Sequence, residues 1–166
     1  MQKQSGFTLI ELLLVLAIIG IISAIAVPAL LGQRERAKAQ AVKDNTTAII
    51  ADLASTLDTL SDPPSERPSI SSGGVNLQTA TTTTSTDRAT AARAFVIGKT
   101  NFTGAKNPYT GVAPCYKLVD TYTPAVGDIN VGIAAVTTDG AIRITGAYKN
   151  PADGATLYLS KDVAVN

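Results

Sequence analysis

The sequence predicts an α+β fold, in which a long N-terminal α-helix packs on a C-terminal antiparallel sheet of about four strands. Three observations predict this architecture. An apolar run of helical length opens the chain, an amphipathic stripe with helical spacing continues it, and short β-rich segments separated by turn signals close it. Because a helix and a sheet each bury one apolar side, we expect the stripe to pack on the sheet.

The apolar run begins after a polar segment, residues 1–6, whose one charge is Lys3. From residue 7 to residue 33 the only charged residue is Glu11. The stretch Leu12 to Leu31 is a helix of about 30 Å if it is continuous, which matches the hydrocarbon thickness of a bilayer. We therefore predict a hydrophobic membrane helix over residues 7–31.

Glu11 decides between interpretations of this segment. An ordinary secretory signal cut near Ala24-Ile25-Ala26 is disfavoured, because its apolar core is about 7–15 residues long and carries no carboxylate. A plain membrane anchor explains the length but not the acid, whose burial in hydrocarbon costs about 2.5–3.5 kcal/mol. A carboxylate kept at such a cost is expected to be functional.

The segment Gly6-Phe7-Thr8-Leu9-Ile10-Glu11, followed at once by the apolar run, resembles the signature of type IV pilins, and its short leader resembles those of type IVa major pilins. The resemblance implies that residues 1–6 are a leader, which prepilin peptidase removes by cutting after Gly6. It also implies methylation of the new amine at Phe7. In the assembled filament, Glu11 of one subunit would then pair with the Phe7 ammonium of a neighbour.

The resemblance further implies a structural subunit of a type IV pilus, serving adhesion, twitching motility or DNA uptake. Its partners would be other copies joined through their N-terminal helices, prepilin peptidase, an inner-membrane assembly platform, and membrane lipid before assembly. The precursor would cross the bacterial inner membrane once, and the mature chain would enter an extracellular filament. Two alternatives stay open: a pseudopilin of a type II secretion or competence system, and a soluble binding protein held by a signal anchor.

Positive charges around the apolar run point to the opposite orientation. Lys3 alone precedes the run, whereas four cations follow it: Arg34, Arg36, Lys38 and Lys43. Counting cations would place the C-terminal part of the chain in the cytoplasm. The signature overrules this count, since the family has a short cytoplasmic leader and an exported head.

The helical pattern continues beyond the membrane segment as an amphipathic half over residues 32–60. Its apolar stripe is Val42, Ile49, Ile50, Leu53, Leu57 and Leu60. Asp62-Pro63-Pro64 ends the helix, because proline disfavours helical geometry in the residue before it. Within the apolar half, Gly20 and Pro28 predict a kink or a weak point. The resemblance adds that the helix loosens between them on assembly.

Residues 61–94 form a predicted Ser/Thr-rich loop, although Thr90–Val96 is also compatible with a short helix or the approach to a strand. Residues 95–166 form the predicted antiparallel β head. Its expected strands are Cys115–Tyr122, Ile129–Thr137, Ala141–Tyr148 and Thr156–Ser160, with turn signals at Asn107–Gly111, Asp139-Gly140 and Asn150–Gly154.

The composition argues against catalysis and against strong nucleic-acid binding. The net charge is +1, from 14 basic and 13 acidic residues, and the chain contains no histidine. Its one cysteine, Cys115, cannot form an intramolecular disulfide and is expected to be a buried hydrophobe. We expect no enzyme activity, no cofactor and no metal, with Asp139 and Asp153 acting as turn residues.

Overall fold

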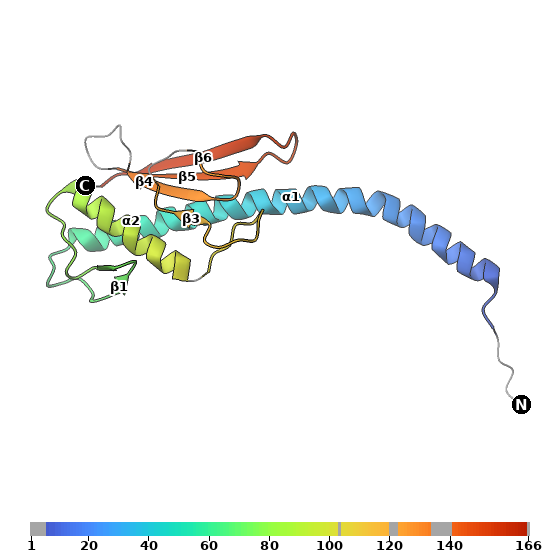
Figure 1. The fold of residues 1–166 in the computed structure, drawn as a ribbon, viewed down its shortest axis with the longest axis horizontal. Helices are drawn as coiled ribbons and strands as arrows, with labels where there is room; N and C mark the ends of the chain where they lie inside the picture. Colours follow the sequence, from blue (N-terminus) through green and yellow to red (C-terminus); the bar gives the residue numbers. More distant parts are fainter. Residues whose placement is uncertain (1–5, 103, 120–122, 134–140, 166) are drawn as a thin grey trace, which may run out of the picture.

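A single helix dominates the molecule. The computed structural model describes residues 6–102, 104–119, 123–133 and 141–165. Helix α1 spans Leu9–Ser61, 53 residues, and its C-terminal half is enclosed in a globular head while its N-terminal half projects away from it (Figure 1). The long helix packed on a C-terminal sheet confirms the predicted α+β class.

The amphipathic half of α1 forms one side of the core. Five residues of the predicted stripe are buried and Ile50 is half-buried, while Ala39, Thr46 and Thr56 extend the buried face. The helix ends at Asp62, whose extended backbone precedes Pro63, and the Asp62 amide donates to the Thr59 carbonyl. The predicted stop is confirmed.

A second helix corrects the predicted loop over 61–94. Helix α2 spans Ser85–Phe102, so the predicted loop ends at Thr84 and the predicted β head begins inside a helix. A capping box starts α2: the Asp87 amide donates to Thr84 Oγ1 and the Thr84 amide donates to the Asp87 carboxylate, both over 3.0 Å. Hydrogen bonds from Thr83 and Thr84 hold the pKa of Asp87 below its usual range.

Between the helices, the loop contains a small hairpin of β1 (Ser71–Ser72) and β2 (Val75–Asn76), which are antiparallel. Gly73 in its turn has φ +56°, a left-handed conformation that favours glycine. The hairpin packs directly against α2, because a Cβ atom placed on Gly98 of α2 would overlap the backbone of Gly73.

This contact gives a test in which two effects oppose each other. Alanine is favoured over glycine inside a helix by about 0.5–1 kcal/mol. We nevertheless expect Gly98→Ala to lower the free energy of unfolding of the head by about 1–3 kcal/mol, because backbone must move to admit the methyl group. Urea titration of the full chain in mild detergent measures this. Gly32→Ala is the control, since nothing lies within 4 Å of its Cβ position. Equal or greater stability of Gly98→Ala would contradict the close contact.

The sheet has the strand order β3-β4-β5-β6. The strands are β3 (Tyr116–Lys117), β4 (Ile129–Ile133), β5 (Ile142–Lys149) and β6 (Thr156–Val163). The last three are antiparallel neighbours, as predicted, but β3 is parallel to β4, with Tyr116 opposite Ile129. The predicted all-antiparallel sheet is therefore mixed. Two strands joined by a tight hairpin are antiparallel, whereas a parallel pair needs a longer connection, and eleven residues separate Lys117 from Ile129.

Two predicted turns are confirmed, and the third lies outside the described residues. In Asn107–Gly111 the Gly111 amide donates to the Asn107 carbonyl over 2.8 Å. In Asn150–Gly154 the Asp153 side chain accepts from the Ala155 amide over 2.9 Å, so Asp153 is a turn residue. Asp139-Gly140 and the predicted ends of two strands, at 120–122 and 134–137, lie outside the described residues.

The core lies between the sheet and α1, with α2 packed on α1 from another side (Figure 1). Cys115 is fully buried in it, as predicted, and burial raises the pKa of its thiol. Burial also raises the pKa of the neighbouring Tyr116 to about 12. The described part of the head thus encloses one apolar core that is shared by α1, α2 and the sheet.

Arg67 was not identified as a buried cation from the sequence. Arg67 is 5% exposed and closes the C-terminal end of α1. Its guanidinium donates to the carbonyls of Asp62 (2.7 Å), Leu60 (2.9 Å) and Ala80 (3.3 Å), and to Thr82 Oγ1 (2.9 Å). The last turn of α1 contains no basic residue, so Arg67 supplies a cation where the helix dipole is negative.

Candidate processing and assembly segment

The predicted cleavage site lies in an open segment before the first turn of α1. Gly6 and Phe7 precede the helix and are exposed, with Phe7 87% exposed. Nothing lies within 4 Å of a Cβ atom placed on Gly6. Both residues that flank the predicted scissile bond are therefore exposed among the described residues.

Thr8 and Glu11 form a capping box at the start of α1. The Thr8 amide donates to Glu11 Oε2 over 3.0 Å, Thr8 Oγ1 donates to the same oxygen over 2.8 Å, and the Glu11 amide donates to Thr8 Oγ1 over 3.4 Å. Sequence reasoning missed this role, although Thr-x-x-Glu before an apolar run is its usual signal. The cap holds the carboxylate at the first turn of α1. No hydrogen bond or ion pair joins the Glu11 side chain to Phe7 within the described residues.

No other described part of the chain packs against the N-terminal half of α1. Its large apolar side chains are exposed from Phe7 to Leu31. Within the described residues, one helix, Leu9–Ser61, contains a stretch long and apolar enough to cross a membrane by length and composition. Such a surface is unfavourable in water, so it needs lipid or other protein chains around it.

Gly20 and Pro28 both lie in this uncovered half. The helix is continuous through both residues, and it curves gently outside the head (Figure 1). Nothing lies within 4 Å of the Gly20 Cβ position. The single chain therefore shows bending without a break, and loosening between Gly20 and Pro28 on assembly stays a prediction.

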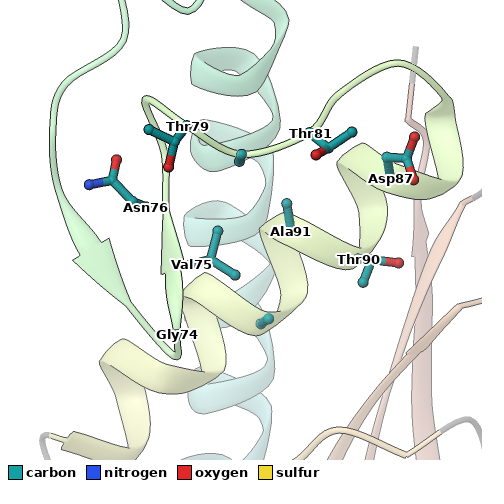
Figure 2. Close-up of a pocket in the computed structure, with 10 residues that line it drawn as sticks. Gly74, Val75, Asn76, Thr79, Thr81, Asp87, Thr90 and Ala91 are labelled. Atoms are coloured by element: carbon teal, nitrogen blue, oxygen red, sulfur yellow. The ribbon is translucent and has the colours of Figure 1, made fainter.

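A shallow groove of about 410 Å³ lies on the head between the β1–β2 hairpin and α2. Figure 2 shows Val75 of the hairpin beside Ala91 of α2, with Thr79 and Thr81 along the rim. Asp87 also lines the groove, but its carboxylate is held by Thr83 and Thr84. Among the described residues, no group of three or more His, Cys, Asp or Glu side chains is placed to hold a metal ion.

Comparisons with known proteins find one matching family model and several relatives that cover part of the chain. The family model for the prokaryotic N-terminal methylation motif matches residues 1–27. Core protein G of the type II secretion system from Klebsiella pneumoniae is 41% identical over 49 residues, 30% of this chain and 35% of the relative. The Escherichia coli K12 protein of the same name is 48% identical over 44 residues, 26% of this chain and 30% of the relative.

A fimbrial protein, EcpB of Eikenella corrodens, is 65% identical over 40 residues, which is 24% of each chain. The chain thus spans about a third of the length of the secretion relatives and a quarter of the fimbrial one. No solved structure matches the chain closely. The similarity therefore concerns a segment of the chain, and the rest of the chain is understood from its own structure.

Proposed function

We propose that this chain, whose residues 1–27 match the prokaryotic N-terminal methylation motif, is a structural subunit of a type IV pilus. Prepilin peptidase would cut after Gly6, and the amine of Phe7 would be methylated. The observation that carries the proposal is Glu11, a carboxylate held at the start of α1 in a helical half whose large apolar side chains, up to Leu31, are exposed. We assign the chain no catalysis, cofactor or metal.

Cleavage would give Glu11 a partner. It creates an ammonium at Phe7, directly before the residue that caps the helix. The cap engages Oε2 of Glu11, and an ionised carboxylate has further acceptor positions for the Phe7 ammonium of a neighbouring subunit. In a lipid or protein interior each charge alone is costly, whereas a hydrogen-bonded pair is tolerated. The pair therefore sets the axial register of one subunit against the next.

The uncovered half of α1 would form the filament core. Its apolar side chains lie in the lipid of the inner membrane before assembly and against other copies afterwards, so the same surface serves both states. An assembly platform in the inner membrane would move the subunit from the membrane into the filament. The closed head then faces outward, where adhesion, motility or DNA uptake takes place.

A second candidate, a pseudopilin of a type II secretion or competence system, is favoured by the named secretion relatives, while the fimbrial relative favours a pilus. Electron microscopy of sheared surface fibres, with mass spectrometry of their subunit, separates the two. Long and abundant fibres built from this chain support the pilus. Their absence from cells that produce the mature chain would support the pseudopilin.

Gly6→Leu is expected to block maturation, because the peptidase must close around a backbone that has almost no side chain at this position. Nearly all of the protein should accumulate in the inner membrane at the precursor mass, as measured by mass spectrometry of membrane fractions. Gly32→Leu is the matched control, since both glycines have nothing within 4 Å. Normal processing of Gly6→Leu would mean that the cut lies elsewhere.

A further inference from the structure

The cations that follow the apolar run have no role in the proposed function. Arg34, Arg36, Lys38 and Lys43 lie directly after it, and only Lys3 precedes it. If the head is exported, these cations lie on the side of the membrane where Lys and Arg are usually depleted. They therefore oppose the orientation of the chain, and another property must account for them.

The depth of each cation follows from the helix geometry. Leu31 is the last large apolar residue of the run, and α1 continues without a break through residue 43. At 1.5 Å per residue, Arg34 lies about 4.5 Å and Arg36 about 7.5 Å beyond Leu31. The headgroup region adds roughly 5–7 Å to each side of the hydrocarbon core. The two arginines thus lie at the level of the lipid phosphates, and both lysines lie above it.

The two lysines are engaged by the head. Lys38 Nζ lies 2.8 Å from Glu35 Oε1 and 5.4 Å from the centre of the Tyr109 ring. Lys43 Nζ lies 4.7 Å from the centre of the Tyr148 ring. The hydrogen bond from Lys38 is the main cause that lowers the pKa of Glu35, so this carboxylate stays charged and turned to Lys38. These contacts fix the base of the head on α1.

Arg34 and Arg36 differ from the lysines. Both are exposed, and no hydrogen bond or ion pair in the described part of the chain engages either guanidinium. Two residues along a helix are separated by about 200°, so the arginines project to nearly opposite sides of α1. A single acidic group on a neighbouring protein cannot reach both. A layer of phosphates that surrounds the helix can.

We propose that Arg34 and Arg36 bind the phosphates of anionic phospholipids in the outer leaflet of the inner membrane. A guanidinium donates two parallel hydrogen bonds to phosphate, which fits arginine at this level better than lysine. The contact holds the waiting subunit at a fixed height, with the base of the head just above the headgroups. The proposal rests on the proposed function for the orientation of the head.

The test uses the full-length precursor in vesicles of phosphatidylcholine that contain a minor fraction of phosphatidylglycerol. Electron paramagnetic resonance of spin-labelled lipids measures how much of each lipid is immobilised by the protein. For the native chain, we expect phosphatidylglycerol to be preferred roughly fivefold at low ionic strength, and the preference to weaken with salt. Arg34→Gln/Arg36→Gln should remove most of this preference.

Two further variants make the comparison specific. Arg34→Lys/Arg36→Lys keeps both charges and should keep part of the preference. Immobilisation of phosphatidylcholine by each variant shows that it has inserted. Lys99→Gln/Lys161→Gln removes two cations from exposed positions on the head and should change nothing. Lys3 is present in all of these chains, so it does not contribute to the difference between them.

No preference in the native chain, or the same preference after Arg34→Gln/Arg36→Gln, would overturn the proposal. Loss of filaments by that variant with an unchanged lipid preference would overturn it too, and would assign the arginines to a contact between subunits. The lipid measurement needs neither peptidase nor filaments. A chain that prefers phosphatidylglycerol through these arginines but is never cut after Gly6 would therefore refute the proposed function alone.

Discussion

Filaments of a Glu11→Val variant are expected to be absent or scarce, although the variant still enters the membrane. Valine removes a carboxylate from an apolar segment, so insertion is unchanged or improved. The Phe7 ammonium of each neighbour then lacks its partner, and an unpaired charge in a closed interior costs several kcal/mol for every subunit added. Counting fibres by electron microscopy, beside the amount of mature chain in the membrane, measures both parts of the expectation.

Two further variants separate the charge of Glu11 from its role in the capping box. Glu11→Gln keeps an oxygen that accepts from the Thr8 amide but removes the charge, so it should also lack filaments. Thr8→Val removes the cap hydroxyl and keeps the charge, so it should still form them. Fibres at the native level in Glu11→Val would refute the pairing. Fibres in Glu11→Gln but not in Glu11→Val would mean that assembly needs the capping box and not the charge of Glu11.

Arg67→Ala is expected to destabilise the head more than Gly98→Ala does. The Arg67 side chain is buried and makes four hydrogen bonds, three of them to backbone carbonyls. Hydrogen bonds that involve a charged group contribute about 1.5–3 kcal/mol each, and the buried carbonyls would be left without a donor. We expect a loss of about 3–5 kcal/mol, a large part of the roughly 5–15 kcal/mol that is typical of a domain.

Urea titration of the full chain in mild detergent measures this loss through the head's unfolding midpoint. Arg67→Lys is the control, because it keeps the positive charge at the C-terminal end of α1 but cannot reproduce the fork of the guanidinium. The loss of stability in Arg67→Lys should be roughly half of the loss in Arg67→Ala. A stability of Arg67→Ala within about 1 kcal/mol of the native chain would show that water replaces the guanidinium without penalty.

The elements that could be predicted are those whose signals are local and long. The stripe from Val42 to Leu60 repeats with the helical period, and Pro63 stops the helix, so the length of α1 follows from the sequence. Helix α2 has an equally local signal in Thr84 and Asp87, but its Ser/Thr-rich surroundings favoured a loop. The missed helix reflects too much weight on composition and too little on capping.

Other features depend on contacts between distant residues. The parallel pairing of β3 with β4 covers only two residues in β3, and nothing in Tyr116-Lys117 specifies a direction. Arg67 resembles an ordinary loop cation until Leu60 and Ala80 are brought to it. In the candidate site, the roles of Gly6, Phe7 and Glu11 stay predictions from signals that are adjacent in sequence, and the proposed level of Arg34 and Arg36 depends on the continuous helix.

The proposed function depends on a cut after Gly6 that leaves the hydrophobic helix on the mature chain. Mass spectrometry of the mature N-terminus, on protein purified from cells that make the filament, detects this cut. We expect a chain that begins with N-methylated Phe7, followed by Thr8 and Leu9. A chain that begins near Val27, or one that retains residues 1–6, would contradict it.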